Sequence, residues 1–594
     1  MKRRISTTKA PRHQEYIGDR FPCEASILSA FVAKLSGIVI CILIVSFTFG
    51  CGRDNRQHAD YIVKNAKVYT ADASFTVLQS FAVTGDHIVA VGTDTSIAAT
   101  YASDSIIDMQ GKVILPGLID AHCHFYGYAK GLRECNLVGT RSFEEVLDRV
   151  KTFAANNKRS WIIGRGWDQN DWAVKVYPDK KILDSLFPTT PVILKRIDGH
   201  AALVNSAAMR AANITDSTEI SGGEILREVL QTPSQRHREI KTRGAATGIL
   251  IDNAVDLVEK VIPPMDEKQN REAILQAQEN CFAVGLTSLD DAGLMKEDVD
   301  LFTEMETSGE LKMRLYIMLS DSTPNYDYYM VKGPVKTPHI DVRSFKFYGD
   351  GALGSRGACL LQNYSDLSGH RGFLLRTPEH YQEKFLQCYD KGFQVCTHCI
   401  GDSANRLILR MYGDILGEGN DRRWRIEHAQ VVNPDDRVYF KKYAIIPSVQ
   451  PTHATSDMYW ADKRLGTERM AGAYAYRSLL QESGIFALGT DFPVENINPM
   501  YTLYAAVVRK DLQGYPEGGF MMNESVGRKD AIRGMTSWAA YSNFEENEKG
   551  SIAPGMFADF IVLSADPMLC AAEDIPEITV LETWSGGQKV YSAK

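Results

Sequence analysis

The most constraining feature of this chain is an alternation of short apolar runs with longer helical stretches over most of its length. Apolar runs that alternate with helices predict βαβ units and a parallel sheet, and thus an α/β fold. The candidate strands are Gly117–His122, Leu286–Asp290, Met313–Leu319, Ser344–Tyr348, Gln394–His398, Trp424–His428, Ile445–Gln450 and Phe486–Asp491. Eight parallel strands are the number that a (β/α)8 barrel requires, so we predict a TIM-type barrel over residues 115–549.

Two further regions fall outside this regular alternation. Short β segments at 59–114 and 550–594 flank the barrel, and we predict that they form one small composite β-sandwich domain built from both termini. Residues 135–280 carry the extra strands Trp161–Arg165 and Pro191–Arg196 together with Gly-rich turns. We therefore predict an insertion after the first barrel strand.

Length, composition and charge exclude several classes of protein. A chain of 594 residues is long enough for one large barrel with appendages. Its 44% hydrophobic, 24% charged and 10% aromatic residues are ordinary globular values, which exclude a disordered or a polytopic membrane protein. The net charge of −8 argues against a nucleic-acid partner. The 11 cysteines form neither a disulfide scaffold nor a zinc-ribbon spacing.

The first 50 residues have the pattern of a signal peptide. Basic residues precede the uncharged stretch Ser36–Phe49, which is shorter than the roughly 20 residues that a spanning helix needs. The stretch ends in Gly50-Cys51 and resembles a bacterial lipoprotein signal, which is cleaved before the cysteine and leaves Cys51 lipidated. A plain secretory signal or a short membrane anchor is the alternative. In each case we expect the catalytic body outside the cytoplasm, in the periplasm or on the outer surface of a bacterial cell envelope, with membrane contact only through this N-terminal segment.

Several predicted strands end in a residue that can bind a metal ion. His122 and His124 are two residues apart on one strand, so both imidazoles face the same side. Later strands end in or carry Lys346, His398, His428 and Asp491. Polar side chains at the carboxyl ends of barrel strands meet at one face, where barrel active sites lie. Imidazole and carboxylate are zinc ligands, and a site with an open position for water can carry out hydrolysis.

Other residues near these strand ends are assigned different roles. Cys396 and Cys399 flank His398 and could form a thiolate site, but buried, inert cysteines are the favoured interpretation. His200 and His453 are predicted to line the substrate pocket rather than to bind metal. Arg356 is a further candidate for substrate binding; it or His200 could stabilise an oxyanion beside the metal.

As a set, these motifs resemble the amidohydrolase superfamily, and more narrowly the amidohydrolase 3 (YtcJ-like) family. The resemblance runs in order from about Asp60 to near the C-terminus. The stretches that carry it are Gly164–Asp168, Asp198–Ala201, Asp350–Gly351, Gly401–Asp402, Arg425–His428, Ser448–Pro451 and Gly489–Pro493.

The resemblance implies a centre of one or two divalent metal ions, with Zn²⁺ as the expected ion. The implied ligands are His122, His124, Lys346, His398, His428 and Asp491. Asp491 is also implied to be the proton shuttle, and Lys346 aligns with the lysine that is carbamylated and bridges the ions in binuclear members. Manganese and iron accept the same ligands, so the identity of the metal stays open.

The predicted function is hydrolysis of a non-peptide, amide-like carbon–nitrogen bond in a small-molecule substrate by metal-activated water. An esterase acting through the same site is the main alternative, and a metal-binding lipoprotein without catalytic activity is another. A deaminase uses a related mononuclear site, but by the resemblance it generally lacks a lysine at the position of Lys346. The substrate stays open, and a homodimer is compatible with the sequence.

Overall fold

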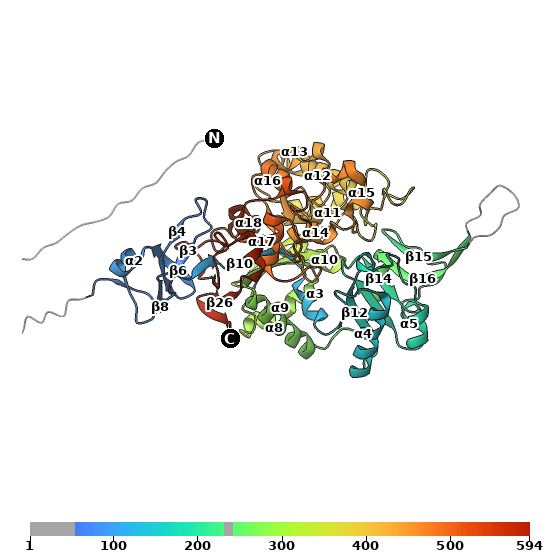
Figure 1. The fold of residues 1–594 in the computed structure, drawn as a ribbon, viewed down its shortest axis with the longest axis horizontal. Coiled ribbons are helices and arrows are strands. Elements are labelled where there is room, and N and C mark those ends of the chain that lie inside the picture. Colours follow the sequence, from blue (N-terminus) through green and yellow to red (C-terminus); the bar gives the residue numbers. More distant parts are fainter. Residues whose placement is uncertain (1–53, 231–241) are drawn as a thin grey trace, which may run out of the picture. The chain divides into compact units, whose positions relative to one another are not determined.

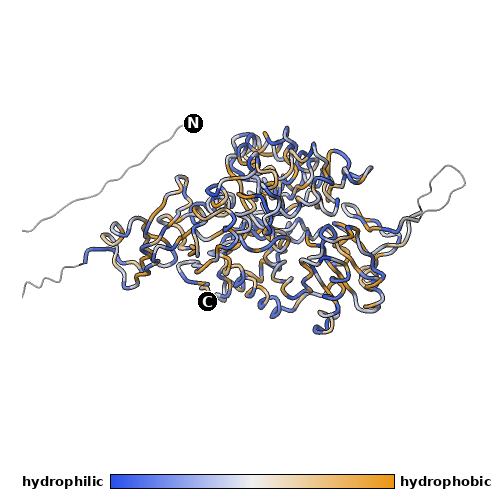
Figure 2. Tube along the Cα trace, in the orientation of Figure 1, coloured by the Kyte–Doolittle hydropathy of each residue, from blue (hydrophilic) through white to orange (hydrophobic). Residues whose placement is uncertain are grey.

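The computed structural model describes residues 54–230 and 242–594 (Figure 1). The predicted signal segment and Cys51 lie outside the described residues. Along the tube in Figure 2, short hydrophobic stretches alternate with hydrophilic ones, as the sequence pattern predicts. Within the described ranges, no helix is both long enough and apolar enough to cross a membrane.

Eight parallel strands form a nearly closed barrel, and this confirms the predicted TIM-type fold. In sheet order they are β10 (Leu118–Cys123), β17 (Leu286–Leu294), β18 (Arg314–Ser320), β20 (Ile340–Tyr348), β21 (Gln394–His398), β22 (Arg425–Glu427), β23 (Ile446–Val449) and β24 (Ala487–Leu488). Each pair of neighbours in this order is parallel. All eight predicted strands are present, although the last three are shorter than the apolar runs that predicted them.

Helices on the outside of the barrel bury one face against the strands, and α11 (Pro378–Lys391) shows how the sequence specifies such a helix. Thr377 caps its first turn by accepting a hydrogen bond from a backbone amide, and Gly392 ends it in a left-handed conformation. Phe385 lies on its buried face, with its ring centre 5.0 Å from that of Phe347 on β20. Both faces of the barrel strands are therefore covered, which explains their nearly continuous apolar sequences.

The barrel closes between β10 and the segment after β24. The Asp491 amide donates to the His122 carbonyl at 2.8 Å, and the His124 amide donates to the Phe492 carbonyl at 2.8 Å. A Cβ atom on Gly489 would lie 2.5 Å from the His122 amide nitrogen, so only glycine allows this close approach. The closure places His122, His124 and Asp491 side by side.

A β-sandwich built from both ends of the chain adjoins the barrel, as predicted. One sheet has the order β6 (His87–Gly92), β5 (Ser80–Thr84), β2 (Tyr61–Lys64), β8 (Ile106–Asp108). The other has the order β27 (Gln588–Ser592), β26 (Val580–Ser585), β25 (Phe560–Leu563), β9 (Val113–Pro116), β3 (Lys67–Tyr69), β4 (Val77–Leu78). Phe81 of the first sheet contacts Phe560 of the second at 5.1 Å between ring centres, so the two sheets share one core.

The insertion forms a separate mixed sheet after β10. Its order is β11 (Cys135–Asn136), β12 (Ile162–Trp167), β13 (Val192–Arg196), β14 (Ala201–Val204), β16 (Thr242–Asp252), β15 (Gly223–Leu230). This sheet has its own apolar core, which includes Trp167 and Leu194. The helix α8 (Glu267–Ala283), which we included in the predicted insertion, instead buries Ile274 and Phe282 in the barrel core. The inserted sheet therefore ends at Asp252 rather than near residue 280.

Candidate metal centre

Most of the predicted site residues line a cavity of about 1000 Å³; His122 and Arg356 do not. The barrel contributes His124, Lys346, Tyr348, His398, His428, His453 and Asp491 to its lining. The insertion contributes Asn136, Arg165, Lys195, His200 and Asp252. The cavity therefore has one wall from each of the two regions.

His122, His124 and Asp491 form the first group that could hold a metal ion. Asp491 Oδ1 lies 3.2 Å from His124 Nε2 and 3.8 Å from His122 Nε2. Asp491 adopts a left-handed backbone conformation, with φ of 62°, which is uncommon for a residue other than glycine. Asp120 holds this segment in place, because its carboxylate accepts hydrogen bonds from the Thr490 amide and hydroxyl at 2.9 and 2.7 Å.

The hydrogen bonds of the two histidines fix which ring nitrogen faces the centre. His122 Nδ1 donates to Glu427 Oε2 at 2.6 Å, and His124 Nδ1 donates to the Ala292 carbonyl at 3.0 Å. Each bond uses the proton on Nδ1 and leaves the Nε2 lone pair available, which is the arrangement of metal-binding histidines.

His428, His453 and Asp491 form a second group with ligand geometry. His453 Nε2 lies 3.5 Å from Asp491 Oδ2, and the His453 ring stacks on that of His428 at 5.7 Å. His428 Nδ1 donates to Gln450 Oε1 at 2.7 Å. The sequence predicted His453 as a pocket residue only; its place on α14 (Pro451–Asp457) brings it to the ligands as well.

His398 and Lys346 complete the predicted set. The His398 ring lies 4.6 Å from that of His428, and Lys346 Nζ lies 3.1 Å from His122 Nε2. Lys346 has no exposed surface. The structure thus brings together all six residues that the sequence predicted as ligands.

The buried histidines are held in the neutral form that metal binding requires. Burial, aided by the charge of Lys346, lowers the pKa of His122 to about 4. Burial and neighbouring histidines lower the pKa of His428 well below its ordinary value. Burial would raise the pKa of Asp491, but interactions with His124 and His428 outweigh it and hold this pKa well below the ordinary range. Asp491 is therefore a carboxylate near the neutral imidazoles of His122 and His428.

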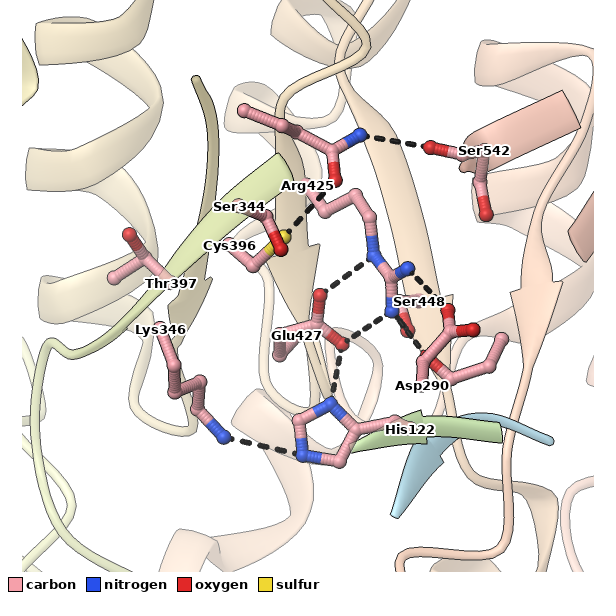
Figure 3. A network of polar contacts seen from close by, with 12 residues as sticks. His122, Asp290, Ser344, Lys346, Cys396, Thr397, Arg425, Glu427, Ser448 and Ser542 are labelled. Atoms are coloured by element: carbon pink, nitrogen blue, oxygen red, sulfur yellow. Dashed lines mark hydrogen bonds and ion pairs between the residues drawn. The ribbon is translucent and has the colours of Figure 1, made fainter. Parts of the chain in front are cut away.

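A buried ionic network supports His122 from behind (Figure 3). Glu427, which accepts from His122, also accepts from Arg425 at 2.7 Å. Arg425 in turn donates to Asp290 at 2.7 Å, and all three charged side chains are at most 1% exposed. Sequence reasoning assigned no role to Glu427 or Arg425. Their signal was present, since two charged residues alternate on one face of a buried strand.

The other predicted pocket residues have different outcomes. His200 lines the cavity, donates from Nδ1 to Asp252 Oδ1 at 2.6 Å, and lies 5.0 Å from His398 between ring centres. Arg356 does not line the cavity; its guanidinium pairs with Asp366 at 3.0 Å. Cys396 and Cys399 are fully buried, and burial raises the pKa of both thiols, which agrees with the inert role predicted for them.

The residues present fit a divalent ion. His398 Nε2, His453 Nε2 and Asp491 Oδ1 are buried polar atoms without a hydrogen bond, although buried polar groups are normally paired. Together with His122 Nε2, which lies 3.1 Å from Lys346 Nζ, and His124 Nε2, which lies 3.2 Å from Asp491 Oδ1, they give the nitrogen and oxygen donors that zinc, manganese or iron accept. Barrel and donor set together define the class of metal-dependent hydrolases with a (β/α)8 fold.

Comparison with known proteins identifies the family. The sequence model of the amidohydrolase family matches residues 105–591, and the chain belongs to this family. Protein LONG AFTER FAR-RED 3 of Arabidopsis thaliana is 31% identical over 90% of this chain and 92% of its own length. The YtcJ protein of Bacillus subtilis is 30% identical over 82% of this chain and 90% of its own length, which confirms the YtcJ-like resemblance.

Two further relatives bear on the activity. An N-substituted formamide deformylase of Arthrobacter pascens is 24% identical over 90% of this chain and 99% of its own length. The crystal structure of an uncharacterized metal-dependent hydrolase from Pyrococcus furiosus superposes with a TM-score of 0.66 at 25% identity, covering 86% of this chain and 99% of the other. The family and these neighbours make this chain a hydrolase of the metal-dependent amidohydrolase type.

Proposed function

We propose that this protein hydrolyses an amide-like carbon–nitrogen bond of a small molecule, with Asp491 as the residue that moves the proton. The observation that carries the proposal is the position of Asp491, whose two carboxylate oxygens each lie within 4 Å of two histidines. Similarity to the N-substituted formamide deformylase of Arthrobacter pascens supports an amide-type substrate such as an N-substituted formamide.

Different residues of the site would have different roles in such a reaction. The six predicted ligands and His453 would hold one or two divalent ions, which would supply Lewis-acid activation of water and of the amide carbonyl. Asp491, ionised at neutral pH, accepts a proton from the attacking water and passes it to the leaving amine. His200 would contact the reacting carbonyl, since it lines the cavity and its ring lies 5.0 Å from that of His398.

Lys346 belongs to the same proposal as a carbamylated bridge in the two-ion form. A charged ammonium 3.1 Å from His122 Nε2 would repel a cation bound to that nitrogen. Carbamylation removes this charge and adds two oxygen ligands at the same place. Mass spectrometry of the intact metal-loaded protein would detect the added CO2; one metal ion beside an unmodified Lys346 would contradict the bridge.

A substrate panel tests the proposed activity. The purified protein, loaded with Zn²⁺ or Mn²⁺, is assayed with N-acyl amino acids, N-substituted formamides and aryl esters. We expect hydrolysis of amides in preference to esters, and a loss of about 10²- to 10⁴-fold in kcat for Asp491→Asn with most of the metal retained. Full activity of Asp491→Asn would refute the shuttle role. Preference for esters would support the esterase alternative, and no turnover would leave a binding protein.

A further inference from the structure

The inserted sheet presents a row of polar side chains to the cavity. Asn136 on β11, Arg165 on β12 and Lys195 on β13 are direct partners across three neighbouring parallel strands. Partners in register point to the same face of a sheet, and all three residues line the cavity. The wall opposite the metal ligands therefore carries an amide, a guanidinium and an ammonium side by side.

The two cations of this row have different surroundings. Lys195 lies 3.3 Å from Glu259 and 4.0 Å from Glu134, so its charge is balanced. Among the described residues, no carboxylate lies within 4.0 Å of the Arg165 guanidinium. Arg165 Nη2 donates to the Ile197 carbonyl at 3.0 Å, and its Nε is buried without an acceptor. An anion that enters the cavity and pairs with this cation would therefore offset part of the free-energy cost of its burial.

The guanidinium lies beside the segment that carries His200, and both Arg165 and His200 line the cavity. Gly199 lies against the guanidinium, and a Cβ atom there would come within 3.3 Å of Nη2. Gly199 directly precedes His200, whose ring lies 5.0 Å from that of His398. A molecule that binds Arg165 through an anionic group would therefore share one cavity with the predicted metal ligands.

The chemistry of the wall favours one kind of anion. A guanidinium group can donate two parallel hydrogen bonds to one carboxylate. Binding then depends on the orientation of the carboxylate as well as on its charge. The cavity lining also includes Asp256 and Glu259, and extra negative charge beside them is unfavourable. A singly charged carboxylate fits this balance better than a phosphate dianion.

We propose that Arg165 binds a carboxylate of the substrate and makes the enzyme selective for acidic amides, of which N-acyl amino acids are the simplest class. This inference rests on the proposed amide hydrolysis and names its substrate class. Arg165 acts on binding and specificity, and the bond-breaking groups remain those of the barrel.

The test compares pairs of substrates that differ only in the carboxylate. N-formyl- and N-acetylleucine are assayed against N-(3-methylbutyl)formamide and N-(3-methylbutyl)acetamide, with wild type, Arg165→Met and Arg165→Lys. We expect Arg165→Met to lower kcat/KM for the acids by about tenfold or more, mainly through KM, and for the neutral amides by less than about threefold. Arg165→Lys should lose less activity than Arg165→Met, because lysine keeps the positive charge but cannot donate two parallel hydrogen bonds to a carboxylate.

Arg210→Met is the matched control. Arg210 is an exposed arginine of the same insertion that also donates to a backbone carbonyl, that of Pro188 at 3.1 Å, and it does not line the cavity. It should change neither substrate series. An equal loss for acids and neutral amides in Arg165→Met, or no loss for the acids, would overturn the proposal.

A binding measurement separates this inference from the proposed function. If the metal-loaded wild type hydrolyses no amide, calorimetric titration with N-acetylleucine still reports on Arg165. Binding at least tenfold weaker in Arg165→Met supports the carboxylate site even then. Equal binding by both proteins, or no binding by wild type, overturns it.

Discussion

Arg425 of the barrel and Arg165 of the insertion both carry a charge close to the cavity, but their surroundings are opposite. Arg425 is fully buried and donates to Glu427 and Asp290 at 2.7 Å each. Arg165 is half-buried and contacts a carbonyl oxygen instead of a carboxylate. The barrel thus uses its charge to fix the ligand His122, whereas the insertion leaves its charge available to a substrate. In the proposed function, the metal ligands and the proton shuttle belong to the barrel, and the insertion supplies the groups that bind the substrate.

The largest effect should come from breaking the network behind His122. Glu427→Gln removes a carboxylate that both orients His122 and balances Arg425, so one buried charge loses a partner. We expect about 10- to 100-fold weaker metal binding and a loss of about 3–5 kcal/mol in the free energy of unfolding. Metal competition and denaturant unfolding measure the two effects.

Glu546→Gln is the control for this variant. Glu546 pairs with Arg423 at 2.9 Å, away from the cavity lining. The same substitution there should leave metal binding unchanged. Wild-type metal affinity in Glu427→Gln would show that the barrel network does not orient the ligand.

A smaller effect on turnover is expected from the insertion's side of the centre. His200→Ala should lower kcat/KM by about 10- to 100-fold, because one hydrogen bond to the reacting carbonyl is lost. The metal content should stay the same, since His200 belongs to neither ligand group. Asp252→Asn should have a weaker effect of the same kind, as it disturbs only the hydrogen bond that orients His200. Loss of metal from His200→Ala would show that His200 is a metal ligand. The ligands would then come from both the barrel and the insertion.

The pH dependence of stability tests Asp291, a buried barrel carboxyl that forms no ion pair within 4.0 Å among the described residues. Burial raises the pKa of Asp291 from 3.8 to about 7, and its Oδ2 accepts from the Tyr126 amide at 3.1 Å. The folded state therefore binds this proton more tightly than the unfolded state, so the free energy of unfolding falls as pH rises from about 4 to about 7. Asp291→Asn removes the effect. Its melting temperature relative to wild type should rise across this range and level off above it; a difference independent of pH would contradict the shifted pKa.

The smallest effect is expected for Arg356. Its pairing with Asp366 outside the cavity lining leaves it no role at the substrate, contrary to the sequence-based assignment. Arg356→Ala should change kcat/KM by less than about threefold, within the range of surface ion pairs. A tenfold loss in kcat/KM would show that Arg356 contributes to substrate binding. It would also weaken the case for Arg165 as the cation that recognises the substrate.

Much of the candidate site could be predicted because each predicted ligand lies at or near the end of an apolar strand. The alternation of side chains in His122-Cys123-His124 and the barrel rule for strand ends were sufficient to predict the convergence of six residues. His453 was underestimated because it lies on α14, and a position on a helix after a strand has no fixed direction in the sequence pattern. Glu427 was missed because its partners, His122 and Arg425, are recognised only once β10 and β22 face each other.

The sequence by itself determined the eight strands, the β-sandwich built from both ends of the chain and the residue types at the candidate metal centre. The spacing of apolar residues and the residues at strand ends are local properties that can be recognised in the sequence. Only the tertiary structure decided which cations have counter-ions and which do not. Arg165, Lys195 and Arg356 all carry a positive charge, but their surroundings differ. Arg165 and Lys195 both line the cavity, and of these two only Lys195 has a carboxylate partner, Glu259. Arg356 lies outside the cavity lining and pairs with Asp366. Charge balance depends on distances between segments far apart in the chain, and folding alone sets those distances.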